Sequence, residues 1–235
     1  MQLFYNSEIN ETTKNFTFDK TESRHIVRVL RKKEGDTIFI TNGLGFLFNS
    51  EIVIANDKRC LVKINSFETH NKPWNYYLHI AIAPTKLNDR FEWFLEKATE
   101  IGIDEITPII CEHSERKVLK LDRMEKIIHS AAKQSLKFTF PKINKPIAFS
   151  QFIKTPIDGQ LFIAHCEETD KKTLKSQLKP STNTTILIGP EGDFSTMEIR
   201  QSLEHKFIPV SLGESRLRTE TAGIVATHSV AFINE

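Results

Sequence analysis

Two strand–loop–helix units near the C-terminus constrain the fold more than any other part of the chain. Residues 184–188 are apolar and β-branched, which predicts a buried strand that stops at Gly189. Pro190 cannot continue a central strand because it lacks a backbone N–H. Ser195 and Glu198 have the spacing of a capping box, so a helix is predicted to begin there. Backbone amides are therefore expected at the carboxyl end of a strand, where open α/β sheets bind ligands.

The second unit repeats this design. Residues 207–212 predict another buried strand, which ends at Gly213, and Thr219 or Thr221 can cap the following helix. The short connection between strand and helix carries two acids and two arginines, namely Glu214, Arg216, Arg218 and Glu220. Packing does not require that much charge, so this loop is a candidate functional site.

The strings GPEG at 189–192 and LRTETA at 217–222 resemble the signature motifs of the SPOUT class of S-adenosylmethionine-dependent RNA methyltransferases. The match is closest to the bacterial 16S rRNA uracil-N3 methyltransferase family. The resemblance implies an α/β fold with a SPOUT-type parallel sheet and a C-terminal trefoil knot, preceded by a small PUA-like β-barrel domain. It also implies S-adenosylmethionine as cofactor, 16S rRNA or the small ribosomal subunit as partner, and a homodimer with the cofactor site near its interface.

The implied chemistry suggests roles for individual residues. Uracil N3 carries a proton whose loss places negative charge on the ring oxygens, so a fixed cation would stabilise the reacting base. We expect Arg218 in that role, and Glu191 or Glu220 to orient the arginine or to take part in proton removal. The resemblance assigns cofactor contacts to Ile188, Gly189, Pro190, Gly192, Leu212, Gly213, Leu217 and Thr221. This chemistry requires no metal.

Residues 1–71 are predicted to form the first domain. The pattern indicates a helix over 20–30 and strands over 37–41, 46–55 and 59–67, and residues 25–43 resemble the PUA-like domain of the family. Six of the domain's ten Lys and Arg residues fall within 20–33. An isolated charge run is usually a solvated face, but the resemblance favours RNA contacts by Arg24, Arg28, Arg31 and Lys32.

Residues 72–235 are predicted to form the methyltransferase domain. A strand over 76–83, a helix capped by Asn88 and ended by Gly102, and a strand over 103–110 form a β–α–β unit, which predicts a parallel sheet with covering helices. Residues 85–108 are similar to the family motif, which places Lys86 and Arg90 near the substrate. The alternative that Arg90 is a surface residue of the first helical turn stays open.

Residues 112–145 are the most basic part of the chain, with nine Lys or Arg against four Asp or Glu. A helix is predicted over 121–136, and its outer face and the preceding loop are expected to bind phosphate groups in a salt-dependent way, Arg116 and Lys117 among them. Two positions depart from the family pattern: His113 stands where arginine is usual, and Leu136 stands where glycine is usual.

Composition excludes several classes of protein. The formal net charge of the 235 residues is +2, so any nucleic-acid signal must be local. Three widely spaced cysteines form no metal or disulfide motif, which fits a reducing cytoplasm. No apolar run is long enough to span a membrane, and we see no secretory signal. The glycine pattern of a dinucleotide site is absent after the first strand of the second domain, and so is the lysine of a phosphate-binding loop after residues 189–192.

Three functions remain open. The first is methylation of uridine N3 in 16S rRNA, in the decoding region. The second is a related methyltransferase that acts on a ribose 2′-hydroxyl or on another base. The third is a non-catalytic rRNA-binding assembly factor, which would bind no S-adenosylmethionine.

Overall fold

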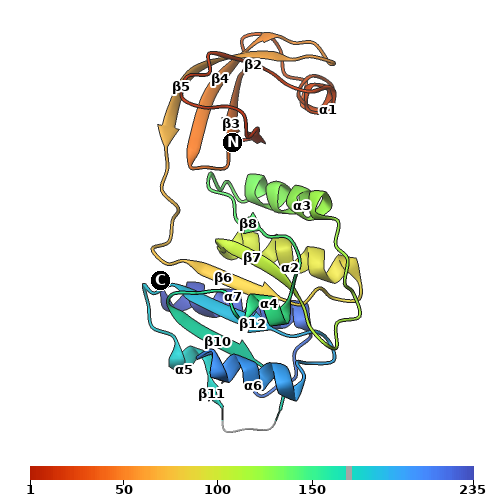
Figure 1. The fold of residues 1–235 in the computed structure, drawn as a ribbon. Coiled ribbons are helices and arrows are strands. Elements are labelled where there is room, and N and C mark those ends of the chain that lie inside the picture. Colours follow the sequence, from red (N-terminus) through yellow and green to blue (C-terminus); the bar gives the residue numbers. More distant parts are fainter. Residues whose placement is uncertain (168–170) are drawn as a thin grey trace. The chain divides into compact units, whose positions relative to one another are not determined.

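The computed structural model describes residues 1–167 and 171–235. The chain forms two compact units, which Figure 1 draws as a ribbon. The first combines Met1–Pro73 with Ala132–Phe140, and the second combines Trp74–Ala131 with Pro141–Glu235. The segment 132–140 therefore packs with the N-terminal residues, although it is inserted between two parts of the second unit in sequence.

The first unit is a curled five-stranded sheet with a short helical segment (Figure 1). The strand order is β1-β3-β4-β5-β2, with β1 parallel to β3 and the other pairs antiparallel. Alternate residues of β3, Ile38 and Ile40, pack against Phe48 and Val62 because successive side chains of a strand point to opposite faces. The strands are β1 (Leu3–Tyr5), β2 (Asn15–Thr17), β3 (Thr37–Thr41), β4 (Phe46–Ile54) and β5 (Leu61–Thr69).

The predicted basic helix begins with α-helical winding and continues with π-helical winding. Helix α1 (Lys20–Arg24) is capped by Asp19, whose carboxylate accepts a hydrogen bond from the Glu22 N–H at 2.8 Å. In the next segment, η1 (His25–Val29), the N–H of Leu30 reaches the carbonyl of His25 five residues back, at 2.9 Å.

The second unit contains the predicted parallel sheet. Its order is β11-β13-β10-β12-β6-β7-β8, with β9 also paired to β7, and all of these pairs are parallel. All five residues of β12 are buried, because this strand lies between β10 and β6. The strands are β6 (Leu78–Ile82), β7 (Glu105–Ile110), β8 (Lys142–Ile143), β9 (Ile147–Ala148), β10 (Gln160–Ala164), β11 (Lys172–Thr173), β12 (Thr184–Ile188) and β13 (Ile208–Ser211).

Helices cover both faces of this sheet (Figure 1). On one face Ile80 of β6 packs in a cluster with Phe94 and Val230. On the other face Ala81, the next residue of β6, packs in a cluster with Phe149. The helices are α2 (Asn88–Ile101), α3 (Leu121–Gln134), α4 (Phe149–Phe152), α5 (Leu174–Gln177), α6 (Thr196–Glu204) and α7 (Thr219–Ile233).

Helix α2 has the predicted end but not the predicted cap. Gly102 ends it with φ 133°, a conformation that residues with a Cβ rarely adopt. Asn88 is the first helical residue, and Leu87 occupies the cap position without a side-chain cap hydrogen bond, so the prediction that Asn88 caps α2 was wrong. The helix tolerates this because its apolar face is buried against the sheet.

The start of α7 also differs from prediction, whereas the start of α6 agrees with it. Arg218 is the cap residue of α7 and makes no side-chain cap hydrogen bond, so neither Thr219 nor Thr221 caps this helix. The Thr219 hydroxyl instead donates to the carbonyl oxygen of Gly189 at 3.1 Å, which links the two C-terminal loops. The capping box that begins at Ser195 is confirmed.

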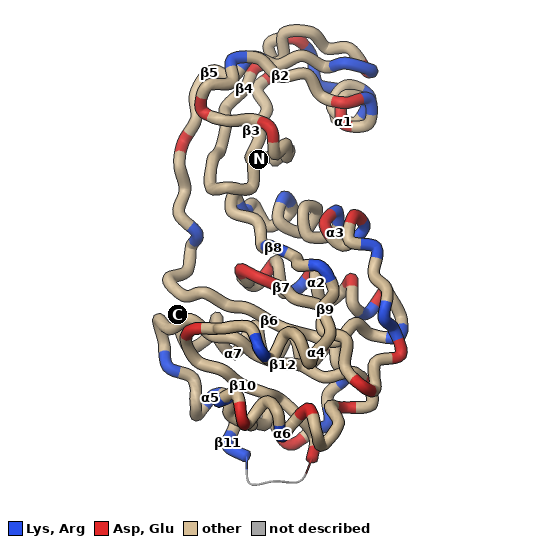
Figure 2. Tube along the Cα trace, viewed as in Figure 1, with Lys and Arg blue, Asp and Glu red and all other residues tan. Residues whose placement is uncertain are grey.

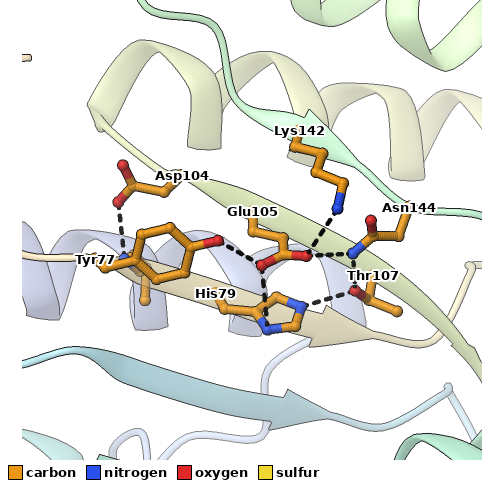
Figure 3. A network of polar contacts seen from close by, with 8 residues as sticks. Tyr77, His79, Asp104, Glu105, Thr107, Lys142 and Asn144 are labelled. Carbon is orange, nitrogen blue, oxygen red and sulfur yellow. Dashed lines mark hydrogen bonds and ion pairs between the residues drawn. The ribbon is translucent and has the colours of Figure 1, made fainter. Parts of the chain in front are cut away.

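A polar network joins the first residues of β6 and β7 with Asn144, which directly follows the short strand β8 (Figure 3). His79 is buried, and its Nε2 lies 2.7 Å from the Thr107 hydroxyl. The Glu105 carboxylate accepts hydrogen bonds from the Tyr77 hydroxyl and from the Asn144 amide, both at 2.5 Å. Burial lowers the pKa of His79. Burial opposes ionisation of Glu105, but these hydrogen bonds outweigh it and lower the pKa of Glu105.

Three general properties concern only the part of the chain that the structure describes. None of its helices is long and apolar enough to cross a membrane. Its His, Cys, Asp and Glu side chains form no group of three that could hold a metal ion. Cys60, Cys111 and Cys166 are free thiols.

Candidate functional site

The sheet order brings three loops together at the carboxyl ends of neighbouring strands. Strand β10 lies between β13 and β12, so the loops that follow these strands share one edge of the sheet. Two cavities of about 360 Å³ each are lined by these loops. The cavities adjoin, since both are lined by Ala164, Cys166, Arg216, Leu217 and Ala222.

The first cavity contains most of the residues predicted from the two motifs. Four of the predicted cofactor residues line it, together with two of the catalytic candidates, Glu191 and Arg218. Arg218 is exposed and stands at the cap position of α7, so the helix start fixes its backbone. The lining residues are Ala164, Cys166, Ile188, Gly189, Pro190, Glu191, Asp193, Arg216, Leu217, Arg218, Thr219 and Ala222.

The second cavity lies along the loop after β13. It includes the predicted residues Leu212 and Gly213, and Gly213 has φ 138°, which favours glycine. Burial lowers the pKa of His165 and raises the pKa of Cys166, so both side chains favour the uncharged form. The lining residues are Ala164, His165, Cys166, Lys171, Val210, Ser211, Leu212, Gly213, Glu214, Ser215, Arg216, Leu217 and Ala222.

Three of the predicted cofactor and catalytic residues, Gly192, Thr221 and Glu220, line neither cavity. Gly192 lies against His113, and a Cβ at this glycine would be 3.1 Å from the His113 Cβ. Glu220 is buried, and its Oε1 lies 3.7 Å from Nε of Arg90 on α2. The structure therefore pairs Glu220 with Arg90 across two helices.

The loop 189–194 is held from both sides. Asp193 adopts φ 64°, and its carboxylate accepts from the Cys166 N–H at 2.7 Å and from the Phe194 N–H at 2.9 Å. His113 Nδ1 lies 3.1 Å from the carbonyl oxygens of both Gly192 and Asp193, so it acts as a donor to this loop. These contacts join the loop to the ends of β10 and β7.

Two carboxylates near this edge have an oxygen without a partner. Oε1 of Glu191 accepts a hydrogen bond from the Lys86 N–H at 2.9 Å. Oε2 of Glu191 and Oε2 of Glu220 are buried and have no hydrogen-bond partner among residues 1–167 and 171–235. Because buried polar atoms are normally hydrogen-bonded, these two oxygens are candidates for a hydrogen bond to a water, a ligand or a protein partner.

The cations predicted to contact RNA in the first unit lie on α1, η1 and the chain that follows. Arg24, Arg28 and Arg31 are exposed and Lys32 is half-buried. Arg28 pairs with Asp57 at 2.8 Å, and this hydrogen bond lowers the pKa of Asp57. A pair this exposed contributes little to stability, so the arginine stays available to a stronger anion.

In the second unit, Lys86, Arg116 and Lys117 occur on two neighbouring loops, and Figure 2 colours the basic stretch before α3 in blue. Lys86 pairs with Glu115 at 2.8 Å on the surface. The Arg116 guanidinium donates to the carbonyl oxygens of Thr85 and Lys86. Lys117 is exposed.

Sequence reasoning missed part of the site. The loop after β10 contributes Ala164, His165 and Cys166, but nothing in the sequence indicates that β10 lies between β12 and β13. A signal did exist for Asp193, because Asp is one of the few residues that tolerate a left-handed conformation after a turn. The other cavity residues that the motifs did not assign are Lys171, Val210, Ser211, Ser215, Thr219 and Ala222.

Comparison with known proteins gives the same picture for the whole chain. Residues 72–231 match an RNA methyltransferase domain, and residues 18–65 match an RNA methyltransferase PUA domain. The ribosomal RNA small subunit methyltransferase E of Buchnera aphidicola is 33% identical over 220 residues, which cover 90% of this chain and 85% of that protein. The protein of the same name from Bacillus subtilis is 28% identical, covering 96% and 93%.

Solved structures agree over the full length. A crystal structure from Porphyromonas gingivalis, described as a probable rRNA-methyltransferase, has a TM-score of 0.93 and 43% identity, covering 100% of this chain and 98% of that one. A ribosomal RNA small subunit methyltransferase E from Neisseria gonorrhoeae, bound to S-adenosylmethionine, has a TM-score of 0.88 and 25% identity, with the same coverage. With both domains, the parallel sheet and the two C-terminal loops in place, the chain belongs to the ribosomal RNA small subunit methyltransferase E family of RNA methyltransferases.

Proposed function

We propose that this protein transfers a methyl group from S-adenosylmethionine to N3 of a uridine in 16S rRNA, in the decoding region of the small subunit. The observation that carries the proposal is the first cavity, where the turns after β12 and β13 meet Glu191 and Arg218. Relatives named for methylation of small-subunit rRNA, one of them bound to S-adenosylmethionine, support it.

The residues present fit this cofactor. Ala164, Ile188, Leu217 and Ala222 provide an apolar wall for a nucleobase, and backbone groups at 189–190 and 211–213 provide polar contacts around it. The unpartnered Oε2 of Glu191 suits a cationic or hydrogen-bonding ligand. When bound, S-adenosylmethionine supplies a methyl group on a good leaving group.

The protein must align the reactants and help the uracil lose its N3 proton. Alignment can contribute about 7–11 kcal/mol, and a positioned base another factor of about 10²–10⁴ in rate. We assign Arg218 to stabilising the negative charge that develops on the uracil oxygens, and Glu191 to accepting the N3 proton. Glu220 is assigned to holding Arg90 and the start of α7, because the two side chains pair.

The substrate is bound through phosphate contacts by the exposed cations of both units. Arg24, Arg31, Lys86 and Lys117 are exposed, and Lys86 forms a surface ion pair with Glu115. Binding to rRNA should therefore weaken steeply as salt rises. The ribosomal substrate implies a cytoplasmic location.

The protein acts as a homodimer in this proposal. Helix α7 carries two apolar residues outside its core-facing side, Phe232, which is 56% exposed, and Val225, which is half-buried, whereas Ile224 and Ile233 pack against the core. A helix that is apolar all round is normally buried, and a second copy of the chain would cover this face. Light scattering should report a dimer, and Phe232→Glu should shift it toward the monomer.

The central test is methylation of unmodified small subunits and of naked 16S rRNA, followed by mapping of the modified base. N3-methyluridine confirms the proposal. Methylation of a ribose hydroxyl or of another base refutes the assigned target but keeps the enzyme class. A chain that binds no S-adenosylmethionine by calorimetry, and whose Arg218→Ala variant still complements a deletion strain, would be an assembly factor.

A further inference from the structure

Arg116 was predicted to contact RNA, but its guanidinium is directed at the protein backbone. Its Nε lies 3.1 Å from the carbonyl oxygen of Thr85 and 3.1 Å from that of Lys86, and its Nη2 lies 2.6 Å from the Lys86 oxygen. Thr85 is fully buried, and Arg116 itself is half-buried. These bonds tie the loop after β7 to the loop after β6.

The peptide group between Thr85 and Lys86 is shared by two charged side chains. Its carbonyl oxygen accepts from Arg116, and its N–H donates to Oε1 of Glu191 at 2.9 Å. Because a trans peptide is planar, these two bonds leave from opposite sides of one rigid dipole. A cation and a carboxylate are thus connected through a single polarisable unit, and each bond strengthens the other.

We infer that Arg116 is a positioning residue for Glu191, acting through the Thr85–Lys86 peptide. The contact fixes Oε1 of the glutamate, so the orientation of the whole carboxylate, including the buried Oε2 that has no partner within the described part of the chain, depends on the Thr85–Lys86 peptide. The inference rests on the proposed function, in which Glu191 accepts the N3 proton.

Arginine suits this role and lysine does not. The planar guanidinium reaches two carbonyl oxygens at once, whereas an ammonium group is a single point charge. For a phosphate contact the two residues are more nearly equivalent, since lysine also binds phosphate. The Arg116→Lys variant therefore separates the two roles at constant charge.

The experiment measures kcat and KM for methylation, and rRNA affinity at several salt concentrations, for Arg116→Lys, Arg116→Gln, Glu191→Gln and the double variant Arg116→Gln/Glu191→Gln. Arg200→Gln is the matched control, because Arg200 is exposed and pairs on the surface with Glu204. We expect both Arg116 variants to lose about 10- to 100-fold in kcat. Their rRNA affinity and its salt slope should stay near those of the control. In the Glu191→Gln background, Arg116→Gln should add little further loss.

A spectroscopic readout makes the test independent of turnover. The backbone amide proton of Lys86 should move upfield in NMR spectra of both Arg116→Lys and Glu191→Gln, since each change weakens a bond to the same peptide. Thermal unfolding of each variant identifies any loss of folding. If Arg116→Gln does not fold, the test rests on Arg116→Lys, which keeps the charge and most of the side-chain volume.

The inference is overturned if Arg116→Lys has wild-type kcat. It is also overturned if Arg116→Gln keeps its kcat at saturating rRNA and instead lowers the salt slope of binding by about one, as loss of a phosphate contact would. Full activity of Glu191→Gln would refute it as well. A wild-type protein that methylates no RNA would refute the proposed function itself. If both the wild type and Arg116→Lys are active, only the inference about Arg116 is refuted, and the proposed function stands.

Discussion

Gly223 sets how closely α7 approaches α2 and β6, and adding one methyl group there should be costly. A Cβ at this position would lie 2.7 Å from two ring carbons of Phe94 and 2.9 Å from Cδ1 of Ile82. Phe94 and Ile82 are fully buried. Neither can move into solvent, so Gly223→Ala must displace the helix or force strained rotamers.

The expected loss follows from two opposing terms. Overpacking a dense core costs about 1–3 kcal/mol. Replacing glycine by alanine inside a helix contributes about 0.5–1 kcal/mol in the other direction. The 2.7 Å contacts with a fully buried ring place the overpacking cost in the upper half of its range. We therefore expect a net loss of about 1–2.5 kcal/mol, which lowers Tm by about 2–10 °C for a chain of this size.

Thermal unfolding followed by circular dichroism measures this change. The Phe94→Leu background is the control: by removing ring atoms it should reduce the additional cost of Gly223→Ala, so that the two losses are less than additive. A Gly223→Ala protein as stable as wild type, or more stable, would refute the packing argument. Because Thr219 and Ala222 of α7 line the first cavity, the same variant should also bind S-adenosylmethionine less tightly.

Three further predictions concern other parts of the chain. Leu136 adopts φ 53° and is 44% exposed, so Leu136→Gly should raise the free energy of unfolding by about 1 kcal/mol, and an unchanged Tm would contradict this. Burial lowers the pKa of His79, so the unfolded chain takes up the proton first as pH falls below 6.5 and stability decreases from there. The pH dependence of Tm should become weaker in His79→Gln and persist in the exposed control His205→Gln. Gly192→Val should push the loop away from His113 and weaken S-adenosylmethionine binding about tenfold with the fold retained, as calorimetry can measure; unchanged affinity would count against the loop's role.

Sequence patterns were reliable where one segment's own chemistry decides its structure. The apolar run at 184–188 forms β12, the Ser195 capping box starts α6, and Gly102 ends α2. Periodicity and capping act over a few residues, so they can be read without knowledge of the fold. The prediction that Thr219 or Thr221 caps α7 failed because the Thr219 hydroxyl bonds to Gly189, thirty residues away in sequence.

For the candidate site too, the sequence predicted some features and the tertiary structure was needed for others. The two motifs lie on loops that line one cavity, to which Glu191 and Arg218 both contribute. Three other features depend on which strands are neighbours in the sheet. Cys166 lines both cavities, Glu220 pairs with Arg90, and Arg116 donates hydrogen bonds to the carbonyl oxygens of Thr85 and Lys86. The residue pattern by itself determined the family and the longer strands, but it did not predict the short strands β1, β2, β8, β9 and β11. Only the tertiary structure decided which polar groups face each other, because parallel strands that are distant in sequence can be ordered in many ways with equal local chemistry.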